Sequence, residues 1–504
     1  MRIEILTILL AFGLLACSDE IKQDTGPARG PGRQSDLECL GKLRPRQSEE
    51  ISGSMWGISC HWIVDPHELT AGQQVDQLAQ LGAKWGFLCP DWNRIESEEG
   101  KYDFNTPDHP LDEAVNAMIK RKITPIIQIY GGNQMYMPVA PDPNNRQMAD
   151  ASLLLDDPVV RQAWHRYIEA MAERYKESVK FWEIWNEPNS DYFWQRDGAY
   201  FRTPVSDYGR IVKEVAAIIR SVQPDAVIIA GSTATVHLEY LEDFLSSEGT
   251  DFFDYWSVHP YGELPEARDD EIRRAQKILE VHGKSAVMWQ SECGFPSDKD
   301  TGGWGWGGPW DETKHAKWVL RRLLSDAAAG MQASVYFVLN DYPALLELGP
   351  DKGKMGINRK GLHYFGSWEP KPAAFAFQNL AGLVDNRMVQ EPYDVSMEIV
   401  SPGSTLSLDN IRTYTLKDRL SGSPVVVYWL AVPMVTDFTA QTVRITLPEE
   451  TIDQPVLVDL LDGRVYEVPV NHEGSALFEE LPLADSPLIL CNRRLVELIP
   501  ESAK

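Results

Sequence analysis

The sequence has few cysteines and fewer basic than acidic residues, and each of these features excludes a class of protein. Cys17 is followed by only five further cysteines in a chain of 504 residues, an odd number at wide spacing. This spacing excludes a disulfide scaffold and favours buried free thiols, although one pair could meet at neighbouring strand ends. Lysine and arginine together number 48 against 74 acidic residues, for a net charge of −26. Such a surface repels nucleic acid and disfavours polyphosphate partners.

Motifs for several kinds of chemistry are also missing. The ten histidines include no H-E-x-x-H or similar helical pair of metal ligands, and no G-x-S-x-G elbow follows a strand. No dinucleotide-binding or P-loop glycine motif directly follows a predicted strand, so no loop is expected to cradle a phosphate. The sequence therefore predicts no bound metal and no cofactor.

Long hydrophobic runs are absent apart from a short one at the N-terminus. The run from Ile5 to Ala16 follows Arg2 and is too short to span a bilayer, so residues 1–17 are interpreted as an export signal. Its end, "LLAC", resembles the lipobox of bacterial lipoproteins. That resemblance implies cleavage before Cys17 and a lipid anchor in a bacterial membrane, either periplasmic or surface-facing. An ordinary secretory peptide cut nearby is the alternative.

The segment after the export signal has the composition of a linker. Residues 18–53 are polar and rich in glycine, proline and charge, and "DTGPARGPGRQSD" contains nothing to bury. We expect a flexible tether here, with a pinning segment around Leu37 to Leu43.

Residues 54–386 alternate between short apolar runs and longer amphipathic segments, as expected of repeated strand-helix units. Helices are predicted at 159–175 and at 315–329, the second ending at Gly330. Eight such units in about 330 residues fit the size of an α/β fold of the (β/α)8 TIM-barrel type, with a doubly wound open sheet as the alternative. The eight runs are "SMWGISCH", "AKWGFLCPD", "KITPIIQIY", "VKFWEIWNE", "DAVIIAGST", "DYWSVHPYG", "SAVMWQSECG" and "ASVYFVLND".

The pattern changes in the last quarter of the chain. Residues 387–504 contain alternating strand patterns such as "PVVVYWLAV" and "TVRITLP" with no good helix between them. The stretch "LLDGRVYEV" predicts a hairpin with Asp-Gly at its turn. We therefore expect the barrel to be followed by a small C-terminal antiparallel β-sandwich.

Two glutamates each close an apolar strand of the predicted barrel, Glu187 after "FWEIWN" and Glu292 after "VMWQS". They belong to predicted strands four and seven, whose carboxyl ends face each other across a barrel mouth. Cleavage of a glycosidic bond needs a facing pair of carboxyl groups, one to protonate the leaving oxygen and one to attack or to position water. In a dry site, repulsion between the pair would leave one acid and one anion. Each glutamate taken singly could instead be a solvated loop residue.

Several motifs resemble a known family. "WEIWNEPN", "SVHPYG" and "WQSECGF", together with "GAKWGFLCPDWNRIESEEGKYDF" and "KPAAFAFQNL", resemble the clan A glycoside hydrolases, and within them family 39 and related exopolysaccharide-hydrolase-like barrels. The resemblance covers most of residues 55–385. It implies a retaining glycosidase that acts by double displacement on a β-linked oligosaccharide or polysaccharide.

The resemblance also implies roles for individual residues. Glu187 becomes the acid/base and Glu292 the nucleophile that carries the covalent glycosyl-enzyme. Asn186 would hydrogen-bond the sugar 2-hydroxyl, Tyr261 would hold Glu292 in its attacking orientation, and His259 would line the same pocket. Retention predicts carboxyl groups about 5 to 5.5 Å apart, against roughly 6.5 to 9.5 Å for inversion.

The sequence departs from the family pattern at two places. Many clan A barrels carry an arginine near the end of strand two that supports the nucleophile, whereas Phe87 stands in "KWGFLCPDW". The loss of that cation predicts fewer stabilising partners for Glu292. The tryptophan of strand eight is also not evident in "VYFVLNDY".

Aromatic residues agree with a carbohydrate substrate. Fifteen of the sixteen tryptophans precede residue 387, and a glycine-rich loop follows the strand that ends near Glu292. Aromatic faces stack on pyranose rings, so the tryptophans of that loop are predicted substrate contacts. Polar and aromatic residues at strand ends are weaker candidates, because such residues often only cap the barrel. The loop residues are Trp304, Trp306 and Trp310, and the strand-end candidates are His61, Trp62, Asp91, Trp92, Tyr130 and Asp341.

A second reading uses the same residues without catalysis. A lipid-anchored carbohydrate-binding protein on an inactive barrel would keep the aromatic contacts but break no bond. Binding alone does not require both glutamates, so the pair favours the enzyme. The sequence leaves the sugar, the mode of cleavage and the oligomeric state open.

Overall fold

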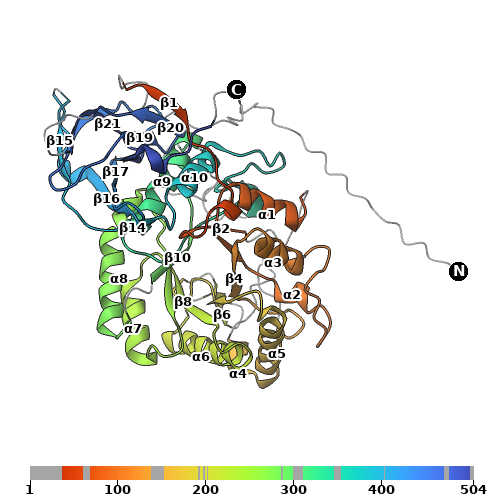
Figure 1. The fold of residues 1–504 in the computed structure, drawn as a ribbon. Coiled ribbons are helices and arrows are strands. Elements are labelled where there is room, and N and C mark those ends of the chain that lie inside the picture. Colours follow the sequence, from red (N-terminus) through yellow and green to blue (C-terminus); the bar gives the residue numbers. More distant parts are fainter. Residues whose placement is uncertain are drawn as a thin grey trace.

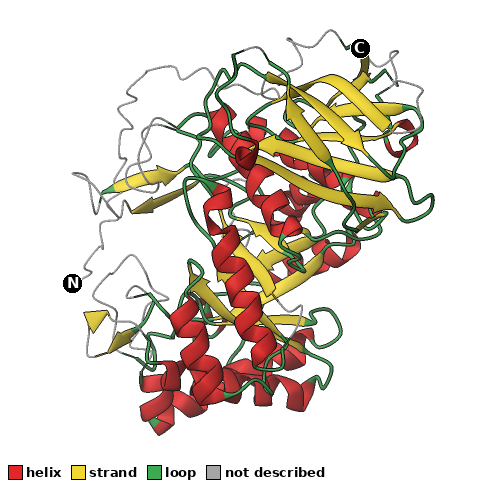
Figure 2. Ribbon diagram, turned by 90° about the vertical axis from the view of Figure 1, so that its left-hand side faces the viewer, coloured by secondary structure: helices red, strands yellow, loops and turns green. Residues whose placement is uncertain are grey.

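The computed structural model describes residues 37–60, 69–137, 152–190, 193–196, 199–200, 203–284, 288–298, 310–345, 354–401, 403–469 and 476–499. Two bodies are visible in these residues, a barrel surrounded by helices and a β-sandwich packed on one side of it (Figures 1 and 2). In this part of the chain, no helix has the length and apolarity needed to cross a membrane.

Eight strands close into the barrel, in the order β10-β11-β2-β3-β4-β5-β8-β9. Neighbouring strands are parallel, and each strand coincides with one of the eight apolar runs of the sequence, with β8 extending one residue beyond its run to Ala234. The predicted (β/α)8 barrel is therefore confirmed. The strands are β2 (Trp56–Ser59), β3 (Trp85–Leu88), β4 (Thr124–Ile129), β5 (Phe181–Ile184), β8 (Val227–Ala234), β9 (Tyr255–His259), β10 (Met288–Cys293) and β11 (Ser334–Tyr336).

A long helix follows each barrel strand and covers its outer side (Figure 1). The predicted helices at 159–175 and 315–329 correspond to α5 and α9. Both have an aspartate at the N-cap, since Asp157 accepts hydrogen bonds from the first backbone N–H groups of α5 and Asp311 accepts one from Lys314. The eight helices are α1 (Ala71–Gln80), α3 (Leu111–Lys120), α5 (Pro158–Tyr175), α6 (Val205–Val222), α7 (Leu238–Glu248), α8 (Asp269–Val281), α9 (Glu312–Ala328) and α10 (Pro372–Leu383).

Shorter elements decorate the loops. Two strand pairs project from the barrel loops, β6 (Gln195–Arg196) with β7 (Ala199–Tyr200), and β12 with β13. The second pair follows β11 and so belongs to the carboxyl end of the barrel. The remaining short elements of the barrel half are α2 (Trp92–Ile95), α4 (Leu153–Asp156), β12 (Tyr342–Leu345), β13 (Met355–Asn358) and the 3-10 turns η2 (Ser48–Glu50) and η3 (Pro265–Arg268).

The barrel interior changes from apolar to polar along the strands. Side chains alternate along a strand, so every second residue points inward. At the amino ends these inward residues form an apolar plug that includes Phe87, Ile126 and Trp289. Two residues further along β4, β5 and β10, the corresponding positions hold Gln128, Glu183 and Ser291, all buried. In these three strands, the inward-pointing polar groups thus lie toward the carboxyl ends.

The C-terminal part is a sandwich of two antiparallel sheets, as predicted. A seven-stranded sheet has the order β1-β20-β19-β22-β17-β16-β14, and a three-stranded sheet has the order β15-β18-β21. The predicted Asp-Gly turn joins β19 to β20, where Gly463 adopts a φ of 75°. The strands are β1 (Cys39–Lys42), β14 (Met388–Gln390), β15 (Ser396–Ile399), β16 (Ile411–Asp418), β17 (Pro424–Leu430), β18 (Gln441–Leu447), β19 (Pro455–Asp459), β20 (Arg464–Glu467), β21 (Ala476–Leu483) and β22 (Leu488–Asn492), with 3-10 turns η4 (Leu408–Asn410) and η5 (Arg493–Leu495).

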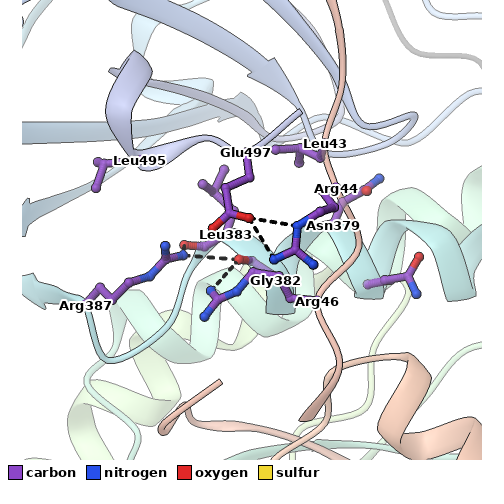
Figure 3. Close-up of a pocket in the computed structure, with 10 residues that line it drawn as sticks. Leu43, Arg44, Arg46, Asn379, Gly382, Leu383, Arg387, Leu495 and Glu497 are labelled. Carbon is purple, nitrogen blue, oxygen red and sulfur yellow. Dashed lines mark hydrogen bonds and ion pairs between the residues drawn. The ribbon is translucent and has the colours of Figure 1, made fainter. Parts of the chain in front are cut away.

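The N-terminal segment is built into the fold from residue 37 onward. Strand β1 pairs with β20 at the edge of the sandwich, which agrees with the expected pinning segment. Arg44 then binds Glu497, and Arg46 donates to the carbonyl oxygen of Gly382 at the end of α10 (Figure 3). Arg46 also pairs with Asp385. Residues 37–53 therefore lie along the seam between barrel and sandwich, and only residues before 37 remain for the expected tether.

Buried charges join the sandwich to helix α9. The ammonium group of Lys317 lies 2.7 Å from Asp485 of the sandwich, and both side chains are almost completely buried. Arg321 pairs with Glu266 at 2.6 Å, and the indole N–H of Trp429 donates to the same carboxylate. Charges withdrawn from water are costly unless they are paired, so these contacts fix the position of one domain on the other.

All five described cysteines have free thiols. Cys39 is exposed, and the other four are buried as the sequence analysis favours. Burial raises the pKa of the Cys60, Cys89 and Cys293 thiols well above the ordinary value, which keeps them protonated and unreactive.

Candidate active site

Three titratable side chains converge at the carboxyl ends of the barrel strands. Glu187 follows β5, His259 ends β9, and Glu292 lies in β10. One oxygen of each carboxylate and one ring nitrogen of His259 all lie within 4.8 Å of one another. The structure thus brings together two glutamates that are 105 positions apart in the sequence.

The backbone leaves the strand abruptly to present Glu187. Trp185 and Glu187 both adopt left-handed conformations, with φ of 69° and 39°, and Pro188 follows. The N–H of Glu187 donates to the carbonyl of Ser232, which has φ of 46° and lies within the register shift between β8 and β9. Such conformations cost of order 1–3 kcal/mol each in residues other than glycine, so packing must hold them in place. Strain of this kind is concentrated where a side chain must be aimed at a ligand.

The Glu292 carboxylate accepts a hydrogen bond from a tyrosine hydroxyl, and the charges of its neighbours shift its pKa. The hydroxyl of Tyr261 donates to Glu292 Oε1 at 2.8 Å. Burial raises the pKa of Glu292, and the nearby charge of Glu187 acts in the same direction. His259, the Tyr261 hydrogen bond and Lys360 all oppose that rise, because each favours the anion.

His259 contacts Glu187 and lies near Glu292. Its Nδ1 lies 3.0 Å from Glu187 Oε1, and its Nε2 lies 3.2 Å from the hydroxyl of Ser291, which in turn bonds Ser257. Burial alone would lower the pKa of this imidazole, but the charges of Glu292 and Glu187 outweigh it and the pKa is raised. His259 therefore carries more positive charge near neutrality than a free histidine.

A polar layer below the pair positions Asn186. The side-chain N–H group of Gln128 donates to Asn186 Oδ1 at 3.2 Å, to Glu183 Oε1 at 3.0 Å and to the Trp185 carbonyl at 3.0 Å. Burial raises the pKa of Glu183 to about 7. Sequence reasoning missed the role of Gln128, although the residue does stand at a strand end, and it missed Ser291 because a serine next to the glutamate carried no distinctive signal.

A cation does lie near Glu292, contrary to the expectation drawn from Phe87. Phe87 is buried in the apolar plug and offers no charge, as the sequence analysis anticipates. Lys360, which follows β13, supplies a positive charge close enough to favour the Glu292 anion. Its position 68 residues after Glu292, beyond a hairpin, left no sequence signal for this contact.

Three of the weaker candidates are structural residues. Trp92 is 1% exposed, stacks on Tyr167 and donates its N–H to Glu96, so it belongs to the core between barrel and helices. Asp91 is the N-cap of α2 and accepts a hydrogen bond from the backbone of residue 93. Asp341 is buried in an ion pair with Lys371 at 2.6 Å. Each of these side chains is occupied by packing or by a structural bond, and their role as substrate contacts stays a prediction.

The aromatic candidates that are described are also buried. Tyr130 is buried and packs edge-on against Trp185, so it supports the strand end. Trp310 packs on Phe295 with ring centroids 4.1 Å apart. The remaining candidates, His61, Trp62, Trp304 and Trp306, lie outside the described residues, as does Cys17.

The same three converging side chains form the one group of potential metal ligands among the described residues. Their existing contacts fit proton handling better than metal binding. His259 Nδ1 faces Glu187, and the Tyr261 hydroxyl already occupies one oxygen of Glu292. The arrangement places two carboxyl groups at one mouth, with a tyrosine hydroxyl donating to one and an imidazole against the other.

Comparison with known proteins gives the family. The model described as Cellulase (glycosyl hydrolase family 5) matches residues 47–297. No curated protein sequence gives a significant match.

Solved structures share the fold at low sequence identity. A family 39 glycoside hydrolase from Bacteroides cellulosilyticus WH2 has a TM-score of 0.64 and 19% identity, over 90% of this chain and 83% of that chain. A monomeric β-xylosidase from Caulobacter crescentus CB15 has a TM-score of 0.57 and 15% identity, over 90% of this chain and 98% of that chain. A family 30 endoxylanase from Clostridium papyrosolvens C71 has a TM-score of 0.55 and 12% identity, over 90% and 98%. With its barrel, its Asn-Glu-Pro strand end and this family match, the segment of residues 47–297 belongs to the clan A glycoside hydrolases.

Proposed function

We propose that the protein is a retaining glycosidase that hydrolyses O-glycosidic bonds of a β-linked oligosaccharide or polysaccharide. The observation that carries this proposal is the close approach of Glu187 and Glu292, whose nearest ligand atoms lie within 4.8 Å. Retention requires carboxyl groups only about 5 to 5.5 Å apart, whereas inversion requires roughly 6.5 to 9.5 Å so that a water molecule fits between. The short separation supports the retaining class.

The partners of each carboxyl group assign the two roles. Tyr261 donates a hydrogen bond to Glu292, and Lys360 adds positive charge on the same side. Both contacts favour an anion at Glu292, so this residue is assigned as the nucleophile. Glu187 follows β5 in a left-handed backbone conformation and contacts His259. It is assigned as the acid/base.

Hydrolysis then takes two displacements. In the first, a Glu292 oxygen attacks the anomeric carbon, the bond to the leaving oxygen breaks, and the proton of Glu187 passes to that oxygen. In the second, Glu187 takes a proton from water while the water oxygen attacks the same carbon and the ester to Glu292 breaks. Asn186 is placed by Gln128 beside the acid/base, where it can hydrogen-bond the sugar 2-hydroxyl.

Removing one carboxyl group at a time tests these roles. In Glu187→Ala, the first step should persist for an aryl glycoside with a very acidic phenol, and azide should restore turnover with a glycosyl azide of retained configuration. In Glu292→Ala, azide should instead give the inverted product, because it takes the place of the nucleophile. Glu263→Gln is a matched control, since Glu263 is an exposed glutamate in the loop directly after Tyr261.

The alternative is a carbohydrate-binding protein on an inactive barrel. Such a protein would bind glycans but show no turnover of any substrate, even as wild type, and both glutamate variants would bind like wild type. Equal turnover by the wild type and Glu292→Ala would also overturn the assignment of the nucleophile.

The first substrates to try follow from the compared proteins. The Caulobacter protein is named as a β-xylosidase and the Clostridium protein as an endoxylanase. We therefore place β-xylosides and xylan first, followed by β-glucosides and bacterial exopolysaccharides. Analysis of product length over time separates terminal from internal cleavage.

We also propose that the enzyme is exported and anchored by lipid at Cys17. The support is the sequence "LLAC" after an apolar run and the polar segment that follows it. Metabolic labelling with a radioactive fatty acid should mark the wild type and fail to mark Cys17→Ala, which would be released into the soluble fraction.

A further inference from the structure

The ammonium group of Lys360 lies against the aromatic ring that serves Glu292. Lys360 Nζ is 4.9 Å from the centre of the Tyr261 ring and 5.8 Å from the centre of the Phe337 ring. The hydroxyl of that same Tyr261 donates to Glu292 Oε1 at 2.8 Å. A cation over a phenol ring draws electron density from the ring and strengthens its O–H as a donor. Lys360 thus acts on Glu292 both through Tyr261 and directly through its charge.

The backbone that carries Lys360 is anchored from several sides. The carbonyl of Lys360 accepts a hydrogen bond from Tyr336 at 2.6 Å, and its N–H donates to the side chain of Asn358 at 3.2 Å. The carbonyl of Arg359 accepts bonds from the backbone and hydroxyl of Ser297, a residue five positions after Glu292. These bonds connect the segment with Lys360 to strand β11 and to the loop after β10.

The next residue is fixed by the buried Asp341–Lys371 pair. The N–H of Gly361 donates to Asp341 Oδ1 at 2.9 Å, and Lys371 donates to the same oxygen. A Cβ at Gly361 would collide with the backbone of Asn340 and Asp341, so only glycine allows this approach. An ion pair and a glycine are thus used to hold one short segment at the barrel mouth.

The groups that face Glu292 come from four parts of the barrel. His259 and Tyr261 reach it from β9 and the loop after it, Glu187 from the end of β5, and Lys360 from the segment after β13. The buried thiols of Cys89, after β3, and Cys293, its neighbour in β10, also lie within its electrostatic reach. Among these described groups, Lys360 alone has a positive charge that persists across the neutral pH range.

We propose that Lys360 is a positioning residue whose fixed ammonium group keeps the Glu292 carboxylate anionic and ready to attack. The inference rests on the proposed function, in which Glu292 is the nucleophile. Its physical basis is the cation–π contact with Tyr261, the Tyr261–Glu292 hydrogen bond and the anchored backbone of residues 358–361. Lys360 does not need to touch the sugar for this role.

The direct test measures the ionisation of Glu292 without any substrate. The protein is labelled with glutamate that carries carbon-13 at the side-chain carboxyl. The signal that disappears in Glu292→Gln belongs to Glu292, and its change with pH reports the pKa of Glu292. In Lys360→Met this pKa should rise by roughly one unit, as expected for the loss of one nearby charge in a partly buried site. Lys360→Arg should restore most of the wild-type value, whereas Lys354→Met, an equal change of charge at an exposed position before β13, should leave it unchanged.

The pH dependence of turnover gives the second readout. In Lys360→Met, the acidic limb of the kcat/KM profile should move to higher pH by the same amount as the pKa of Glu292. At pH values below both limbs, kcat/KM should then fall about tenfold for each pH unit of that shift. A rise in KM at every pH with no movement of the titration would mean that Lys360 binds substrate, and would overturn the proposal. So would a uniform loss of kcat that Lys360→Arg fails to rescue. If the Met variant does not fold, Lys360→Gln replaces it in both measurements.

The two proposals fail in different ways. If the wild type turns over no glycoside but the Glu292 titration still moves in Lys360→Met, the electrostatic coupling stands and the enzymatic function falls. If turnover is present but the titration is the same in Lys360→Met and in the wild type, the function stands and the role of Lys360 falls.

Discussion

Glu183 makes a prediction that does not depend on any substrate. This carboxyl group lies in the barrel interior with 0% exposure, and burial raises its pKa to about 7 from an ordinary value of 4.5. The folded protein therefore holds the proton more tightly than the unfolded chain does. It follows that the contribution of Glu183 to the free energy of unfolding falls as pH rises from 4.5 to 7, and then stays at the lower level.

The magnitude follows from the two pKa values. The interval between 4.5 and about 7 corresponds to about 3 kcal/mol at 1.36 kcal/mol per unit, of which about 2 kcal/mol falls between pH 5.5 and 8. Glu183→Gln keeps the shape and the contact to Gln128 but cannot ionise. Between pH 5.5 and 8, the variant should therefore gain about 2 kcal/mol in stability relative to wild type.

Urea unfolding followed by tryptophan fluorescence measures this difference, because fifteen of the sixteen tryptophans precede the sandwich. The series starts at pH 5.5 to stay clear of the isoelectric point of about 4.8. Glu169→Gln, at an exposed position on α5, is the control and should follow the wild type. Parallel stability curves for Glu183→Gln and wild type across this pH range would refute the reasoning.

Three further predictions concern contacts described above. Asp485→Asn leaves the buried Lys317 charge unpaired and should lower the free energy of unfolding by about 3–5 kcal/mol in urea titrations, whereas replacing both partners with apolar residues should cost less. Tyr261→Phe removes a donor that favours the Glu292 anion, so the acidic limb of kcat/KM should move upward by about one pH unit, and an unchanged limb would contradict the assignment. Gly361→Ala should lower stability by about 1–3 kcal/mol in thermal unfolding and reduce kcat/KM, and a variant with wild-type stability would show that the backbone there can yield.

The sequence predicts the barrel well because each strand is a compact apolar run between helical segments. The eight strand-helix units expected from the sequence correspond to the eight strands of the closed barrel in the described part of the chain. The positions of Glu187 and Glu292 also explain why the sequence predicts that these two side chains meet. Both stand at the carboxyl end of a strand, and all such ends open on one mouth.

Local patterns could not reveal which strand-end residues are already occupied. Trp92 and Asp341 have the residue types expected of sugar contacts, but one is stacked in the core and the other is paired with Lys371. Those partners are distant in sequence, so only the folded chain shows that the groups are satisfied. Lys360 is the converse case, since its importance comes from a hairpin that carries it back over Tyr261.

The seam between the two domains bears on how this protein can be cut or recombined. Helix α9 belongs to the barrel by chain order, yet its Lys317 finds its counter-ion in the sandwich, and its Arg321 also donates to a sandwich carbonyl at Val432. A truncated barrel would present these cationic groups to solvent beside newly bared apolar surface. A fusion of the barrel to another module should therefore include the sandwich, so that the two domains are transferred together.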